Sequence, residues 1–165
     1  MRYLWLLLPL AAASGCAPRT RPRSVAPCSP PAPDAQAWRE YPIREFTYRL
    51  PPGYKRTETI GVDIPLLEWA KGSRKLQWGM APPAAPLSLR PEPRDSTISD
   101  FSECIAKIAG HRARLATYRR VNEYFAVVRW ENFPGPWQES LVLWGPDRAG
   151  QVEAIAIFRS ARPAP

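Results

Sequence analysis

Residues 122–131 of this chain read NEYFAVVRWE, and this stretch decides the fold class. In an extended strand, successive side chains point to opposite faces. The residues that fall on one face are Tyr124, Ala126, Val128 and Trp130. Phe125 and Val127 fall on the other face, so both faces carry apolar side chains. We therefore expect residues 122–131 to form a central strand of a β-sheet.

Stretches rich in β-branched and aromatic residues predict further strands on either side of this one. They are residues 111–118, 138–144 and 152–158 in the C-terminal half, and residues 44–50, 57–62, 66–70 and 74–78 in the N-terminal half. Residues 80–95 contain five prolines and are predicted to form a long internal loop.

One helix is predicted between the two halves. Its apolar residues, spaced three or four apart, are Ile98, Phe101, Ile105 and Ile108. Residues 96–99 offer N-terminal caps and Gly110 offers a C-terminal stop. Strands, then a helix, then antiparallel strands predict an α+β fold, in which few helices pack on an antiparallel sheet to form an α/β sandwich.

Three segments carry a resemblance to a known family. They are residues 46–54 (FTYRLPPGY), the predicted helix that ends at Gly110, and residues 154–160 (AIAIFRS). Together they are similar to the Mog1/PsbP-like fold over most of residues 44–160. The resemblance implies the same α/β sandwich. It supplies no catalytic residues, because proteins that share this fold serve unrelated functions.

The N-terminus reads as an export signal. Eleven apolar residues, 3–13, form a helix of only about 16 Å, about half the thickness of a bilayer core. A basic start, an apolar middle and small residues are typical of a secretory signal. Ser14 and Gly15 directly before Cys16 resemble the lipobox of bacterial lipoproteins. The resemblance implies a signal peptide over residues 1–15 and acylation of Cys16; the alternative is ordinary cleavage after residues 11–13.

Residues 16–37 are predicted to be a tether, because their prolines favour an extended polyproline II chain that reaches up to about 60 Å. Residues 38–165 then form one domain of ordinary size. More than one acyl chain on Cys16 would make a stable anchor. The non-acidic Ala17 resembles the sorting pattern of the outer membrane, so we expect an envelope location that faces the periplasm.

The chain is basic. Its 23 Lys and Arg against 15 Asp and Glu give +8, and loss of Arg2 with the signal leaves 22 against 15, or +7. Positive charge favours association with anionic envelope material. The alternative is that codon usage in a GC-rich genome explains the excess of arginine. We expect no nucleic-acid partner for an exported chain.

If Cys16 is acylated, Cys28 and Cys104 are the remaining cysteines. An oxidising compartment permits a disulfide between them. Alternatively, Cys104 is a small buried apolar residue of the predicted helix.

Enzyme chemistry finds little support in the sequence. There is one histidine, His111, and the chain contains no common hydrolase, phosphate-binding or paired-cysteine metal motif. His111 follows the predicted helix stop, which favours a surface or capping role. We therefore assign no catalytic residue, no metal and no cofactor.

Two groups of residues are candidates for binding. Phe133 and Trp137 lie in residues 132–137 (NFPGPW), where Pro-Gly suits a type II turn. They form an aromatic platform if they point outward and cap the core if they point inward. Arg112 and Arg114 share one face of a predicted strand, where they either contact an anion or are ordinary solvated charges.

These observations predict a membrane-anchored envelope lipoprotein that acts as a binding or structural accessory module. Its expected partners are membrane lipid, through acylated Cys16, and an anionic envelope component or an envelope protein. The alternative is a hydrolase that acts on cell-envelope material.

Overall fold

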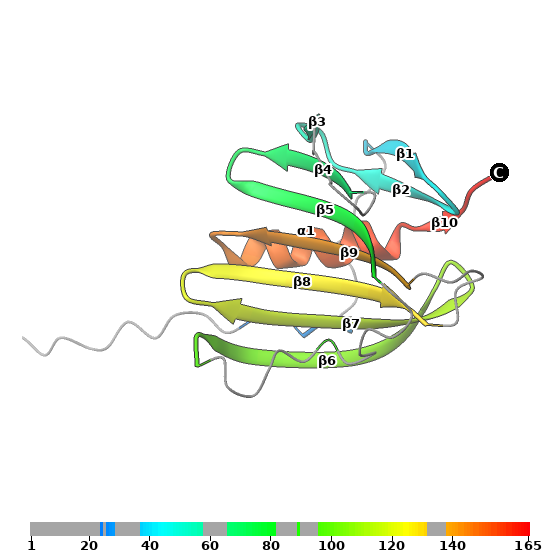
Figure 1. Ribbon diagram of the computed structural model, residues 1–165. Coiled ribbons are helices and arrows are strands. Elements are labelled where there is room, and N and C mark those ends of the chain that lie inside the picture. Colours follow the sequence, from blue (N-terminus) through cyan, green and yellow to red (C-terminus); the bar gives the residue numbers. More distant parts are fainter. Residues whose placement is uncertain are drawn as a thin grey trace, which may run out of the picture.

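The computed structural model describes residues 24, 26–28, 37–57, 66–81, 89, 96–131 and 138–165. These residues form a seven-stranded antiparallel sheet, a three-stranded sheet and one helix (Figure 1). The broad α+β class predicted from the sequence is therefore confirmed.

The large sheet has the strand order β3-β4-β5-β9-β8-β7-β6. Its strands are β3 (Lys55–Thr57), β4 (Leu66–Lys71), β5 (Arg74–Ala81), β6 (Ile98–Ile108), β7 (His111–Arg120), β8 (Glu123–Trp130) and β9 (Gln138–Gly145). β8, which lies in the stretch that decides the fold, is an interior strand paired with β7 and β9. β9, directly beside it, is the middle strand of the seven.

The small sheet consists of β1 (Arg39–Ile43), β2 (Phe46–Leu50) and β10 (Arg162–Pro163), with β2 in the middle. Together with the helix α1 (Arg148–Arg159) it forms a second layer against one face of the large sheet (Figure 1). The core fills the space between the layers. Its largest fully buried side chains are those of Trp78, Trp130, Tyr48, Phe46 and Phe158.

The predicted helix over residues 98–110 is wrong, because residues 98–108 form the edge strand β6. A β-bulge explains the misleading pattern. Ser99 pairs with Arg119 and Ser102 with Thr117, so two residues of β6 stand opposite the single residue Tyr118. The extra residue breaks the period of two, and apolar residues from both faces then fall at three- and four-residue steps.

The predicted strand over residues 152–158 is also wrong, because these residues belong to α1. Asp147 is the N-cap of this helix, and its side chain accepts a hydrogen bond of 2.7 Å from the backbone N–H of Gly150. Gln151, Ala154 and Phe158 are buried at helical spacing against the sheet. Asp147 was a sequence signal for the start of a helix, but the alternating apolar residues that follow favoured a strand instead.

An ion-pair network fixes α1 to the β4–β5 hairpin. The carboxylate of Glu153 accepts hydrogen bonds of 2.9 Å from the hydroxyl of Tyr54 and from Nζ of Lys71. Arg74 lies 3.2 Å from Glu153 and 3.0 Å from Asp147. Because Glu153 is mostly buried, its cationic partners offset the cost of removing the carboxylate from water.

Replacing the N-cap tests this account of α1. Asp147→Ala removes both the cap and one of the two carboxylate partners of Arg74, and we expect the free energy of unfolding to fall by about 1–2 kcal/mol. Asp147→Asn keeps an acceptor oxygen at the cap and should cost less than half as much. Urea denaturation of the two variants measures the difference, and equal losses would contradict the capping role.

Candidate binding surface

The two faces of the large sheet are covered very differently. α1 packs against one face, and Phe46 and Tyr48 of β2 pack there against Trp130, whereas the opposite face, called the open face below, has neither of these elements on it (Figure 1). On the open face the backbone N–H of Leu89 donates a hydrogen bond of 3.4 Å to Glu103.

Strand register places Lys75, Trp144, Phe125 and Tyr118 in one row on the open face. In this row Lys75 pairs with Trp144, Trp144 with Phe125, and Phe125 with Tyr118.

The three rings of this row form a continuous stack, called the aromatic row below. The ring centroids of Tyr118 and Phe125 are 4.9 Å apart with an interplanar angle of 5°, and those of Phe125 and Trp144 are 6.2 Å apart at 11°. All three side chains are half-buried. Each ring therefore stands on an interior strand, packs on its neighbour and keeps part of its surface accessible to a partner.

Sequence reasoning missed the aromatic row. It placed Phe125 on the second face of its strand, but it assigned the aromatic platform to Phe133 and Trp137. Those two residues lie outside the described residues, as do Cys16 and the signal peptide. The signal that was available is the spacing of Tyr118 and Phe125 around a two-residue turn, which sets them directly opposite each other.

Arg112 and Arg114 share one face of β7, as the sequence predicted, and this face belongs to the open face of the sheet. Both are paired with buried or half-buried carboxylates. Both arginines form ion pairs with Glu131, which is 8% exposed. Arg114 also lies 3.7 Å from Glu103. Two carboxylates therefore contact Arg114, while Arg129 stands directly opposite it on β8. The cluster is an Arg–Glu network beside the aromatic row. Because Arg112 and Arg114 are already paired with carboxylates, the cluster is better suited to be the polar border of a binding surface than a site that binds an anion.

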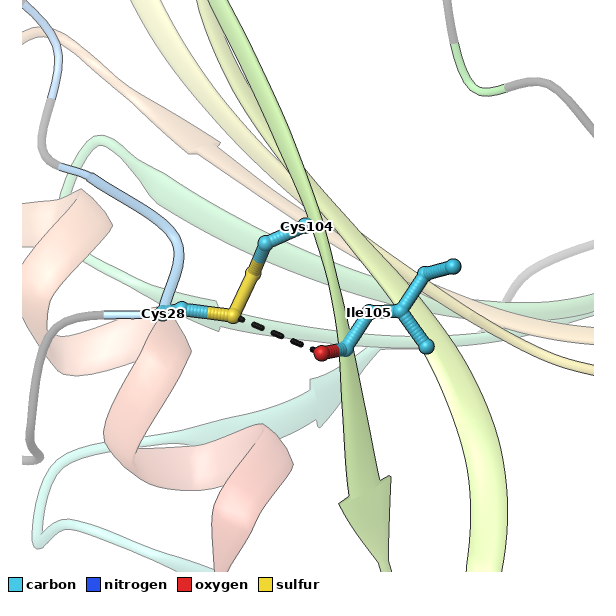
Figure 2. The surroundings of a disulfide bond; sticks show 3 residues. All are labelled: Cys28, Cys104 and Ile105. Atoms are coloured by element: carbon cyan, nitrogen blue, oxygen red, sulfur yellow. Dashed lines mark hydrogen bonds between the residues drawn. A yellow bond between two sulfur atoms is a disulfide. The ribbon is translucent and has the colours of Figure 1, made fainter.

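Cys28 and Cys104, whose pairing the sequence left open, are joined by a disulfide in the structure, with their Cα atoms 6.1 Å apart (Figure 2). Cys104 belongs to strand β6 and not to a helix. The sulfur of Cys28 also lies 3.8 Å from the carbonyl oxygen of Ile105. The disulfide thus attaches the N-terminal segment to the edge of the large sheet.

His111 begins β7, and its ring lies 5.8 Å from the ring of Phe46 in an edge-on contact. The side chain is half-buried. In the part of the chain that the structure describes, no three His, Cys, Asp or Glu residues gather closely enough to hold a metal ion. The ring contact with Phe46 places His111 at the border of the core.

Glu139 is a carboxyl group buried on the helix side of β9, and it is 2% exposed. Burial raises its pKa to about 7, and Glu45 adds to this effect, while Trp78 and Arg44 partly oppose it. The same burial, together with the charge of Glu139, raises the pKa of Tyr48. A pKa near neutrality is typical of general acids, but a carboxyl that is 2% exposed is closed to a substrate.

No protein-family model matches this chain, and no curated protein matches it in sequence. Among the described residues, no helix has both the length and the apolar character needed to cross a membrane. Any assignment of function therefore depends on the surfaces described above.

The pKa of Glu139 predicts an unusual dependence of stability on pH. In the unfolded chain the carboxyl ionises near pH 4.5, whereas in the folded protein it stays protonated up to about pH 7. The folded state therefore loses at most about 3 kcal/mol of stability as pH rises through this window. Above about pH 7, ionisation of Glu139 causes no further loss. Glu139→Gln should remove that dependence.

Urea denaturation of both proteins at about pH 5 and about pH 8 measures this difference. The loss of stability between about pH 5 and about pH 8 should be larger in the unsubstituted protein than in Glu139→Gln. Parallel curves for the two proteins would show that Glu139 ionises normally in the folded state.

Proposed function

We propose that this protein is a lipid-anchored lipoprotein of the bacterial cell envelope whose domain is a binding module, with the open face as its binding surface. The observation that carries this proposal is the aromatic row on three adjacent interior strands. Aromatic residues are enriched at the centres of protein interfaces, where they supply large contact areas at little cost in conformational entropy.

The surroundings of the aromatic row support a protein partner. Interior strands hold the rings rigidly, so little freedom is lost when a partner packs against them. Lys75 flanks one end of the row, and its side chain is half exposed. The Arg–Glu network lies further along the same strands. An apolar centre with a polar rim is the usual anatomy of a protein interface.

The anionic component predicted from the net charge is a weaker candidate, because Arg112 and Arg114 are already paired with carboxylates. We therefore favour an envelope protein as the partner and assign no chemistry to the domain. For the fold family, we retain the Mog1/PsbP-like sandwich as a proposal, but without the helix ending at Gly110 that carried part of the resemblance, because that segment is strand β6. It is supported by an antiparallel sheet that carries its helix on one face.

Acylation of Cys16 is tested by intact mass. The protein extracted from membranes should carry a lipid-sized mass increment, and Cys16→Ala should lose both the increment and the association with membranes. Two acyl chains hold a protein stably on a membrane, and we expect no stable membrane association of this protein without them. A soluble protein of unmodified mass would contradict the anchor.

The binding surface is tested by photo-crosslinking in intact cells. A photoreactive phenylalanine analogue at position 125 should give a discrete adduct with an envelope protein, because position 125 is the middle ring of the aromatic row. Trp144→Ala in the same background should reduce the adduct at least about fivefold, as expected for the loss of an aromatic contact worth about 1 kcal/mol or more.

The matched control places the same analogue at Ala149, which is exposed on α1, away from the open face. Thermal unfolding of each variant verifies that the domain is folded. Identical adducts at positions 125 and 149, or an adduct insensitive to Trp144→Ala, would show that the open face is not the binding surface.

A further inference from the structure

The N-terminal segment is docked on the domain at several points. The Cys28–Cys104 disulfide attaches it to β6, and Pro27 beside it is buried. Four residues before Cys28, the hydroxyl of Ser24 accepts a hydrogen bond of 3.3 Å from the amide of Gln151 on α1. Ser24 and Cys28, which the sequence analysis assigned to the tether, therefore both contact the domain.

Docking shortens the reach of the anchor. Seven residues, 17–23, separate Cys16 from Ser24, and these eight steps along the chain extend at most about 28 Å. A ten-residue strand such as β7 is about 33 Å long. The tether is thus too short to run the length of the domain, and the end of the domain nearest Ser24 must lie close to the membrane.

That end of the domain carries the β7–β8 turn. The amide of Gln151, which contacts Ser24, also donates to the backbone carbonyl oxygens of Tyr118 and Phe125, at 3.1 and 3.0 Å. Tyr118 and Phe125 are paired residues just behind the turn formed by residues 121 and 122. Ser24 and this turn therefore lie at the same end of the sandwich.

Val121 at the tip of this turn is an exposed apolar residue in a strained conformation. Its side chain is 59% exposed, the highest value among the large hydrophobic residues that the structure describes. Its φ is +53°, in the left-handed region that β-branched residues avoid. A hydrogen bond of 3.0 Å from its N–H to the carbonyl oxygen of Thr97 holds it there. Such a residue contributes neither burial nor favourable backbone geometry to the fold.

The charged side chains at the end of the domain that carries the β7–β8 turn are of both signs. Arg120 is exposed beside it and stands opposite Glu123, and Arg148 is exposed at the start of α1. Arg119 donates a hydrogen bond to Ser99 and lies 3.9 Å from Asp100. In the sequence, three further arginines at positions 19, 21 and 23 come directly before Ser24. Basic residues around an exposed apolar tip are the chemistry that an anionic lipid surface attracts.

We propose that the β7–β8 turn, with Val121 at its tip, contacts the anionic membrane surface to which the chain is tethered. This inference rests on the proposed lipid anchor at Cys16. The disulfide and the Ser24–Gln151 contact orient the domain so that the turn meets the lipid headgroups. The strands of the large sheet then extend away from the bilayer, and the aromatic row is held beside it.

The test uses the mature, acylated protein reconstituted into vesicles of phosphatidylethanolamine and phosphatidylglycerol, with an environment-sensitive fluorophore on Asn122→Cys. We expect emission to rise about threefold relative to the detergent-solubilised protein, because the tip enters the headgroup region. Val121→Asn should abolish the rise without lowering the thermal stability, since asparagine tolerates the left-handed conformation. Arg120→Gln with Arg148→Gln should weaken it, as should vesicles of phosphatidylcholine alone.

The matched control carries the fluorophore on Lys107→Cys, an exposed position near the other end of the sheet, where emission should not change. An equal response at both positions, or a response at position 122 that persists in Val121→Asn, would overturn the proposal. Intact mass of the same sample separates the two inferences. An unmodified Cys16 refutes the anchor, whereas an acylated protein with no response at position 122 refutes only the membrane contact.

Discussion

A single helix of twelve residues can cover only part of one face of a seven-stranded sheet. α1 runs along β9 (Figure 1) and is about 10 Å wide, whereas the seven strands side by side span about 29 Å. β2 and its hairpin complete the cover on one side of α1, and buried Pro27 with the Cys28–Cys104 disulfide adds cover at β6. The N-terminal segment is thus part of the second layer, and the open face is left with neither helix nor small sheet.

The strands could be predicted because apolar alternation and two-residue turns are local signals. Residues 111–118, 122–131 and 138–144 were placed correctly as strands for this reason. The helix was misplaced because local patterns conflict with tertiary structure at two points. In β6 a bulge opposite Tyr118 imitates helical spacing, and in α1 a short alternating run outweighed the cap at Asp147. In both cases a single residue, the extra residue of the bulge or the N-cap, determines which secondary structure the apolar pattern forms.

The candidate surface could be predicted only in part, because it depends on strand register. The turn at residues 121–122 alone sets Tyr118 opposite Phe125, and it also brings Glu131 beside Arg112, where its N–H bonds to the Arg112 carbonyl oxygen. Trp144 joins the row through the pairing of β8 with β9. The connection between those strands is too long for its sequence to fix the register. The Arg–Glu pairing was therefore within reach of sequence reasoning, and the complete aromatic row was not.

The edges of the large sheet explain why the disulfide lies where it does. β3, at one edge, has only three residues, whereas β6, at the other, has eleven. A long edge strand invites pairing with other chains. The bulge opposite Tyr118 and the exposed Lys107 interrupt this edge, and the disulfide at Cys104 fixes a chain segment against it. One covalent bond therefore has two consequences: it restrains the vulnerable edge of the sheet, and, together with the Ser24–Gln151 contact, it holds part of the N-terminal segment against the domain.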